Sequence, residues 1–334
     1  MSNFSDNFFS KLRGIYAFSI YVPKSKTLVL ARDHAGIKPL YYYSSGSDIA
    51  FASEIKALGP ILKGKVSVNE DQVRSFLNLA YCTEPQTIYN EVHSLPPGTF
   101  RIFNFKSKET ISSNIFDRDF SEFNSNSYSI NLEKTNSLLI DAVRKNINAD
   151  VEVAVALSGG VDSSLVYALA NKFEPIKGIT VKMGDKRYDE SEVAKEYASQ
   201  VGGEHEIVTT DAESKLDLLR RLLAHFDQPY ADSSLIPFFI LNQQARKHTK
   251  VLIGGDGGDE IQGGYGGYSR LPFLHKLQVT KSVCAPALRC LTALSLSDDK
   301  KRKLEKVINL ISQPNFNQML FYYHSWFPTS NKYC

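Results

Sequence analysis

A seven-residue turn constrains this chain more than any other stretch of its sequence. Residues 158–164 read Ser-Gly-Gly-Val-Asp-Ser-Ser, directly after the apolar run 151–157 and before the helix-like run 165–170. A strand that turns through serine and glycine into a helix exposes the first free N–H groups of that helix. The helix dipole adds partial positive charge at the same place. The pattern therefore predicts a phosphate-binding loop inside an α/β fold.

The side chains of this loop extend the prediction to a nucleotide and its metal ion. Serine hydroxyls donate hydrogen bonds to phosphate oxygens. The carboxylate of Asp162 fits beside a phosphate when a divalent cation lies between them. The Gly-Lys-Ser/Thr ending of the Walker loop is missing. The alternative interpretation is a tight strand-to-helix turn with a serine at the N-cap.

After residue 131 the sequence alternates between strand-like and helix-like runs. Strands are expected at 151–157, 176–183, 204–209 and 250–254, and helices at 132–146, 163–172, 191–201 and 216–225. This rhythm predicts an α/β fold with a doubly wound parallel sheet. Ligands of such sheets bind at the carboxyl ends of the strands, where residues 158–164 lie.

Three further segments are expected near that edge. Residues 180–183 end the second strand, where main chain could hydrogen-bond adenine; ordinary strand termination explains them equally well. Residues 227–237 form a polar loop before an apolar helix, which by itself indicates an N-cap. Residues 254–265 place six glycines around Asp256, Asp259 and Glu260. Such a loop suits Mg²⁺ that bridges to phosphate, or a cationic or amide group, and a merely flexible loop is the alternative.

The first part of the chain has a β pattern instead. Strands are expected at 14–21, 27–31 and 48–53, with a helix starting at 54–58. The segment 106–130, rich in Ser, Asn and charge, predicts a linker. The expected domains are therefore residues 1–105 and residues 131–334.

Composition excludes several classes of protein. A net charge of +3 is too small to indicate nucleic-acid or membrane binding. No apolar run reaches the roughly 18 residues that span a bilayer, and residues 1–10 do not resemble a secretory signal. The four cysteines have no zinc-site spacing. They are interpreted as reduced thiols of a cytoplasmic protein.

These motifs resemble those of the asparagine synthetase (glutamine-hydrolysing) family. Residues 158–164 resemble the pyrophosphate loop of ATP pyrophosphatases. Residues 254–260 resemble the family's Ser-Gly-Asp/Glu-Gly-x-Asp-Glu motif, with Gly254 in place of the serine. The later half of a class II glutamine amidotransferase domain, a four-layer αββα sandwich, is similar to residues 13–18, 31–41, 52–58 and 94–99.

The resemblance implies an ATP-dependent carbon–nitrogen ligase. Such an enzyme converts aspartate, ATP and ammonia or glutamine into asparagine, AMP and pyrophosphate, with Mg²⁺ at the phosphates. Residues implied to bind ATP and pyrophosphate are Leu157, Ser158, Gly159, Gly160, Val161, Asp162, Ser163, Ser164, Val181, Gly255 and Gly257. The implied metal ligands are Asp162 and Asp259, and the implied catalytic residue is Asp256. The implied substrate loop contributes Asp232, Ser233 and Glu260.

The sequence departs from the family pattern near both ends. The family nucleophile is a Cys directly after the initiator Met, whereas this sequence has Ser2. The lysine-bearing segment that ends the family's synthetase domain has no counterpart. We therefore expect a truncated amidotransferase-type β domain and a C-terminally incomplete synthetase domain. Ammonia would come from solution or from a partner chain that supplies the missing glutaminase half. Half a sandwich also predicts an open sheet edge and an uncovered apolar face.

Two other functions remain open from the sequence. One is a non-catalytic fragment or scaffold that binds nucleotide weakly. The other is ATP-dependent amidation of a different carboxylic acid, such as a sugar acid, or closure of a lactam ring. ATP/pyrophosphate exchange with a panel of acids separates these alternatives from asparagine synthesis.

Overall fold

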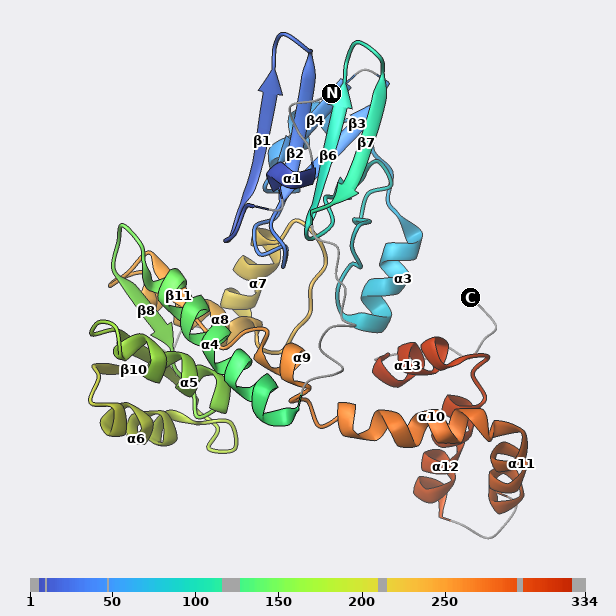
Figure 1. Ribbon diagram of the computed structural model, residues 1–334. Helices are drawn as coiled ribbons and strands as arrows, with labels where there is room; N and C mark the ends of the chain where they lie inside the picture. Colours follow the sequence, from blue (N-terminus) through green and yellow to red (C-terminus); the bar gives the residue numbers. More distant parts are fainter. Residues whose placement is uncertain are drawn as a thin grey trace. The chain divides into compact units, whose positions relative to one another are not determined.

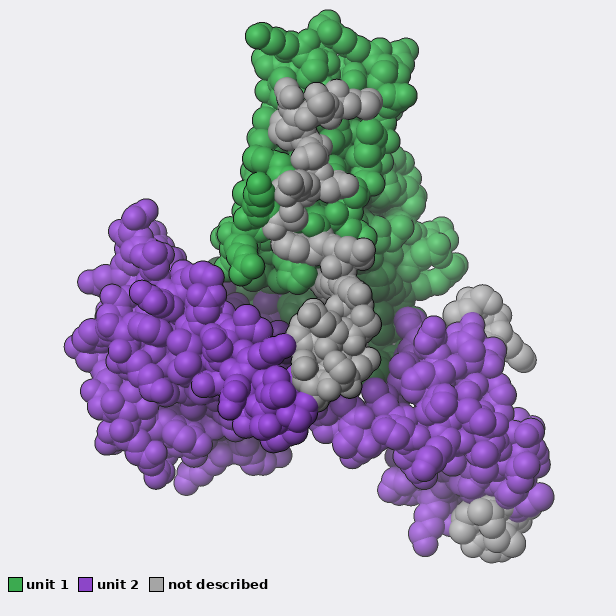
Figure 2. Space-filling view, in the orientation of Figure 1, with its two compact units in different colours: residues 1–121, 221–231, 324–334 green, residues 122–220, 232–323 purple. Residues whose placement is uncertain are grey.

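A computed structural model describes residues 6–9, 11–46, 48–115, 127–209, 215–292 and 297–325. The chain divides into two compact units (Figure 2). Unit 1 comprises residues 1–121, 221–231 and 324–334, and unit 2 comprises residues 122–220 and 232–323. Among the helices in the described ranges, none combines the length and the apolar character needed to cross a membrane.

Unit 1 is built on two antiparallel sheets (Figure 1). Its strands are β1 (Ala17–Val22), β2 (Thr27–Arg32), β3 (Tyr41–Ser45), β4 (Asp48–Ala52), β5 (Val92–Ser94), β6 (Thr99–Asn104) and β7 (Glu109–Asn114). Its helical segments are α1 (Asp6–Phe9), the 3₁₀ helix η1 (Ile55–Leu58), α2 (Gly59–Leu62) and α3 (Glu70–Leu79). The strand order is β1-β2-β6-β7 in one sheet and β4-β3-β5 in the other.

Three apolar clusters stack these elements into layers. The cluster between the two sheets consists of Leu28, Leu30, Leu40, Tyr42, Leu95 and Phe103. The cluster between α1 and the outer face of the first sheet consists of Phe9, Val29, Ala31, Phe100 and Ile115. The cluster between the second sheet and η1 with α2 consists of Tyr43, Ile55, Leu58, Leu62 and Val92. The layers follow the αββα order that the resemblance implies.

The uncovered apolar face expected of a half sandwich is absent at β2. Every residue of this strand is buried. Alternate side chains point to opposite faces of a strand, so Leu30 faces the second sheet and Val29 faces α1. The expectation is wrong for this strand because α1 packs on its outer face, where the rings of Phe9 and Phe100 stack at 4.1 Å.

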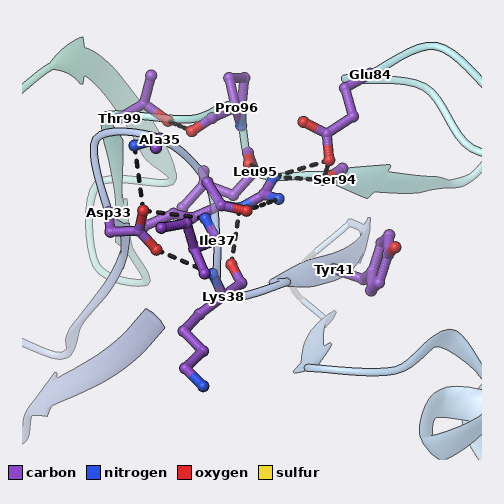
Figure 3. A network of polar contacts seen from close by, with 12 residues as sticks. Asp33, Ala35, Ile37, Lys38, Tyr41, Glu84, Ser94, Leu95, Pro96 and Thr99 are labelled. Carbon is purple, nitrogen blue, oxygen red and sulfur yellow. Dashed lines mark hydrogen bonds and ion pairs between the residues drawn. The ribbon is translucent and has the colours of Figure 1, made fainter. Parts of the chain in front are cut away.

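A buried polar network fixes the loop between β2 and β3 (Figure 3). The carboxylate of Asp33 accepts hydrogen bonds at 3.0–3.1 Å from three backbone N–H groups, those of Ala35, Ile37 and Lys38. The guanidinium of Arg32 donates to the Leu95 carbonyl at 2.7 Å and to the Glu84 carboxylate at 2.9 Å. Arg32 and Asp33 are both buried, and both charged groups are hydrogen-bonded. They therefore hold the loop against the segment that joins β5 to β6.

Unit 2 carries a parallel sheet and most of the helices (Figure 1). Its strands are β8 (Val153–Ala156), β9 (Lys177–Lys182), β10 (His205–Thr209) and β11 (Val251–Ile253). The helices around them are α4 (Tyr128–Ile147), α5 (Val161–Asn171), α6 (Ser191–Val201), α8 (Leu235–Ala245) and α9 (Gly258–Gln262). Helix α7 (Lys215–His225) ends in residues of unit 1. The later helical segments are η3 (Tyr268–Arg270), α10 (Leu271–Val279), α11 (Lys281–Thr292), α12 (Asp298–Ile311) and α13 (Phe316–His324).

The sheet of unit 2 is doubly wound, as the sequence predicts. Its order is β10-β9-β8-β11 with all neighbours parallel, so the chain direction across the sheet reverses between β8 and β11. One face is covered by α4, α5 and α6 through a cluster around Val155 and Tyr167. The other face is covered by α8 through a cluster around Ile179 and Ala245. Ligands of such sheets bind where the order reverses, at the carboxyl ends of the strands.

One element differs from its expectation. Strand β7 lies inside the range 106–130 that the sequence marks as a linker, and it pairs with β6 through Phe103↔Thr110. Its residues are mostly exposed because it is an edge strand, so its Ser- and Asn-rich composition carries no apolar signal. Residues 116–126 of the expected linker lie outside the described residues.

Candidate active site

The turn between β8 and α5 has the backbone of an anion-binding loop. Leu157 is buried in the core cluster below the turn, so its side chain anchors the loop to the sheet. Gly160 is the N-cap of α5, and no side chain caps the helix. Val161 and Asp162 are the first two helical residues, and Val161 is 76% exposed. The N-terminal N–H groups of α5 are therefore not capped by a side chain.

The serines of the loop bond to one another. The hydroxyls of Ser158 and Ser163 are 2.7 Å apart, and the Ser158 hydroxyl also accepts from the Gly160 N–H at 3.1 Å. The Ser164 hydroxyl donates to the Ser158 carbonyl at 3.4 Å. Ser163 is buried. These hydroxyls thus bond within the loop itself, and the phosphate role expected from the sequence stays a prediction.

The acidic glycine-rich loop after β11 packs directly on the Ser158 loop. A Cβ atom on Gly255 would lie 2.8 Å from the Asp162 Cβ and 2.8 Å from the Ser163 backbone nitrogen. A Cβ atom on Gly258 would lie 2.5 Å from the Asp162 carboxylate. Because β8 and β11 are parallel neighbours, both loops leave the same edge of the sheet. The structure therefore brings together the two segments singled out from the sequence, with Asp162 between them.

The acidic side chains of the second loop lie in three different settings. An Asp256 carboxylate oxygen lies 2.9 Å from the position of a Cβ on Gly254, and Asp259 packs against Gly264. Gly257 has φ +88°, a left-handed conformation that favours glycine. Glu260 accepts a hydrogen bond of 2.7 Å from the Tyr265 hydroxyl. This bond lowers the pKa of Glu260 and raises the pKa of Tyr265 to about 12.

Strand β9 places main chain beside the same turn. Ala156 pairs with Ile179, and the Leu157 N–H donates to the Ile179 carbonyl at 3.0 Å. Peptide groups two residues apart along a strand point to the same side, so those of Val181 also point toward β8. Strand β8 has ended at that level. The main chain of Val181 therefore faces the turn that starts at Leu157.

A short polar chain supports the turn from below. The Thr180 hydroxyl donates to the Leu157 carbonyl at 2.7 Å and lies 2.8 Å from His205 Nε2. Since a carbonyl only accepts, the Thr180 hydrogen is used there and His205 donates to Thr180. Burial, with a smaller contribution from Lys195, lowers the pKa of His205. A neutral imidazole therefore holds Thr180 under Leu157.

The expected substrate loop before α8 forms its own local turn. Asp232 accepts hydrogen bonds from the Ser234 backbone at 2.7 Å and from the Ser234 hydroxyl at 2.5 Å. The hydroxyl bond lowers the pKa of Asp232. Ser233 is exposed. Among the described residues, no hydrogen bond joins Asp232 or Ser233 to the Ser158 loop, so these two residues stand apart from the contacts just given.

One residue of this site was not expected from the sequence. Glu190, at the start of α6, accepts a hydrogen bond of 3.0 Å from the Gly159 N–H. A Cβ on Gly159 would lie 3.2 Å from the Cβ atoms of Glu190 and Val193, so the first turn of α6 lies against the loop. Only a conserved spacing between loop and helix could have signalled this contact, and a single sequence does not display it.

The donor set suits a magnesium ion bound together with phosphate. No cluster of three or more His, Cys, Asp or Glu side chains forms a metal site within the described parts of the chain. Mg²⁺ in nucleotide sites takes one or two carboxylates, completed by phosphate oxygens and water. The structure places Gly258, the residue before Asp259, against the Asp162 carboxylate, whereas the Asp259 carboxylate lies against Gly264.

Comparison with known proteins adds two family matches. The profile of the family described as asparagine synthase matches residues 134–332, and that of the glutamine amidotransferase domain matches residues 2–114. Asparagine synthetase (glutamine-hydrolyzing) 1 of Bacillus subtilis (strain 168) is 31% identical over 274 residues, which cover 78% of this chain and 41% of that protein. A putative asparagine synthetase (glutamine-hydrolyzing) 2 of Methanocaldococcus jannaschii is 30% identical over 80% of this chain and 53% of its own.

Solved structures overlap this chain only in part. An NH3-dependent NAD synthetase from Campylobacter jejuni matches 40% of this chain and 60% of its own at 20% identity, with a TM-score of 0.29. That similarity is too low to carry any argument about the site. The chain spans about two fifths of the length of the Bacillus subtilis relative, 41%.

Proposed function

Because this chain belongs to the asparagine synthase family, we propose that it is an ATP-dependent amide ligase acting on aspartate. The β-carboxylate of aspartate attacks the α-phosphorus of ATP, and the bond to the β-phosphate breaks to release pyrophosphate. Ammonia then attacks the acyl carbon of β-aspartyl-AMP, AMP leaves, and the ammonium nitrogen loses a proton. The products are asparagine, AMP and pyrophosphate.

One observation supports this proposal above the others. Asp162, within the serine-glycine loop, is in van der Waals contact with Gly255 and Gly258 of the acidic loop. A phosphate-binding turn and a carboxylate-rich turn at the reversal point of a doubly wound sheet suit a nucleotide whose phosphates carry a metal ion. Positioning and charge stabilisation at phosphorus are the main contributions such a site makes.

The proposed roles follow the position of each residue. The N-terminal N–H groups of α5, with Ser158 and Ser164, bind the pyrophosphate. The main chain of Val181 meets the adenine edge, and Asp256 orients the acyl intermediate or takes the ammonium proton. Asp162 and Asp259 would hold Mg²⁺, which neutralises phosphate charge when bound. Asp232, Ser233 and Glu260 remain proposed contacts to aspartate.

The nitrogen donor and the setting are also proposals. Ammonia enters from solution, or from glutamine that a partner chain hydrolyses. We place the reaction in the cytoplasm. Cys82, Cys284 and Cys290 are free thiols, which fits a reducing compartment, and Cys334 lies outside the described residues.

ATP/pyrophosphate exchange in the presence of aspartate tests the function. Replacing Asp162 by Ala should lower the exchange rate by roughly 10²–10³-fold, the usual loss when one preorganised electrostatic partner is removed. Asp141→Ala is the matched control, because Asp141 is an exposed residue of α4 that pairs with Lys145. Equal rates in the two variants would remove Asp162 from the site. If only another acid supports exchange, that acid and not aspartate is the acceptor. If no acid supports exchange, the non-catalytic alternative is favoured.

A further inference from the structure

The phosphate-binding loop of this protein already has an anion on one of its donors. The Gly159 N–H, which the loop would offer to a phosphate oxygen, donates instead to Oε2 of Glu190 at 3.0 Å. The two residues are 31 positions apart in the sequence. A carboxylate oxygen and a phosphate oxygen have the same sign of charge and accept the same kind of hydrogen bond.

Glu190 is not used for the structural task that its position suggests. It is the N-cap residue of α6, yet its side chain makes no capping hydrogen bond to that helix. The neighbouring Asp189 accepts instead from the Ser191 N–H at 3.2 Å and from the Met183 N–H at 3.4 Å. Helix α6 is therefore started by Asp189, and the Glu190 carboxylate is left for the Ser158 loop.

The contact between Glu190 and Gly159 is close, but the Glu190 side chain has room to leave it. A Cβ on Gly159 would lie 3.2 Å from the Cβ and Cγ1 atoms of Val193, so α6 itself is packed against the loop. Glu190 is exposed, and the connection from β9 to α6 that precedes it is mostly exposed too. The carboxylate can thus turn into solvent by side-chain rotation while α6 stays in place.

We propose that Glu190 is a gating residue of the nucleotide site. Its carboxylate holds the place of a phosphate oxygen on the Gly159 N–H, and an arriving pyrophosphate group displaces it. One N–H cannot serve both anions at full strength, and two anions that compete for one donor repel each other. The hydrogen bond to Glu190 thereby stabilises the loop, at the expense of affinity for pyrophosphate. This inference rests on the proposed function, because it assumes that the loop binds pyrophosphate.

Binding of inorganic pyrophosphate in the presence of Mg²⁺ tests the proposal. Isothermal titration of the full chain would compare the unmodified protein with Glu190→Gln, which keeps the shape, and Glu190→Ala, which removes the contact. Both variants should bind pyrophosphate about fivefold more tightly, which corresponds to about 1 kcal/mol. Glu192→Gln is the matched control: Glu192 is an exposed residue in the first turn of the same helix, and it should leave the affinity unchanged.

A second measurement needs no ligand. In ¹⁵N-labelled protein, the amide resonance of Gly159 should shift in Glu190→Gln and in Glu190→Ala, and should stay in place in Glu192→Gln. If the Gly159 amide resonance has the same position in both Glu190 variants as in the unmodified protein, the contact itself is refuted.

The binding outcomes separate the two proposals. Unchanged affinity in both Glu190 variants overturns the gating role alone. Weaker binding in those variants also overturns it, because Glu190 would then help to hold the metal–pyrophosphate complex. If none of the four proteins binds pyrophosphate, both the gating role and the proposed ligase function fail.

Discussion

Replacing Gly255 by Ala tests the close approach of the two loops on which the proposed site depends. The new Cβ would lie 2.8 Å from the Asp162 Cβ, 2.8 Å from the Ser163 nitrogen and 3.0 Å from the Asp162 carbonyl carbon. Carbon atoms in contact prefer separations of about 3.5–4.0 Å. The loop after β11 must therefore move away by roughly 1 Å, because the Asp162 and Ser163 backbone belongs to the first turn of α5.

This displacement has two measurable effects. Overpacking of this kind lowers the free energy of unfolding by about 1–3 kcal/mol. For a unit of this size, about 2 kcal/mol lowers the melting temperature of its transition by roughly 4–8 °C. A misplacement of about 1 Å at the reacting groups should also reduce ATP/pyrophosphate exchange by roughly 100-fold.

The matched control lies in the same glycine-rich stretch. A Cβ on Gly266 would have no atom within 4 Å, and its φ is not left-handed. Gly266→Ala should therefore keep the exchange rate, and it should melt at the same temperature or slightly higher, since Ala restricts the unfolded chain. Differential scanning fluorimetry and the exchange assay would be run on both variants. Matching results for Gly255→Ala and Gly266→Ala would show that the two loops are not in contact.

Two further predictions concern parts of the fold outside the two loops. Asp33→Ala should lower the free energy of unfolding by about 3 kcal/mol or more, because three backbone N–H groups lose a buried acceptor; a loss below about 1 kcal/mol in urea titrations would contradict the network in Figure 3. Burial, with Lys195 nearby, lowers the pKa of His205 in the folded protein. Near pH 6.5 the unfolded chain therefore binds a proton at His205 more readily than the folded protein does. The free energy of unfolding should thus fall as the pH drops below about 6.5, and His205→Gln should flatten this slope; identical slopes between pH 7.5 and 5 would refute it.

The parallel sheet could be predicted because its signal is local. Each buried strand of unit 2 is an apolar run, and each intervening helix has its own apolar period, so strand, loop and helix follow from short windows of sequence. The Ser158 loop is local in the same sense, since glycine, serine and the helix start occur within seven consecutive positions. Even the contact between the two loops was predictable, because parallel strands place their carboxyl ends at one edge.

What escaped prediction depends on docking between distant elements. Strand β7 has no apolar face of its own, and only its register with β6 makes it a strand. The role of Glu190 follows from the packing of α6 against Gly159, not from its own neighbours. Its sequence context, just before a helix, indicates a cap, and Asp189 takes that role instead.

The glycines of the acidic loop show how structure decides between alternatives that composition leaves open. A glycine-rich stretch is compatible with a flexible loop, yet Gly255 and Gly258 lie where a Cβ would collide with Asp162. At these two positions glycine is required for close packing, and it brings the acidic segment against the Ser158 loop. Gly266 and Gly267 have open space around them, so the flexible interpretation survives only there. The requirement for glycine extends past the contact with Asp162, because a Cβ on Gly264 would collide with the Asp259 carboxylate and Gly263 has a left-handed φ of +68°. Close packing therefore determines the glycines up to Gly264, and the open space begins only after it.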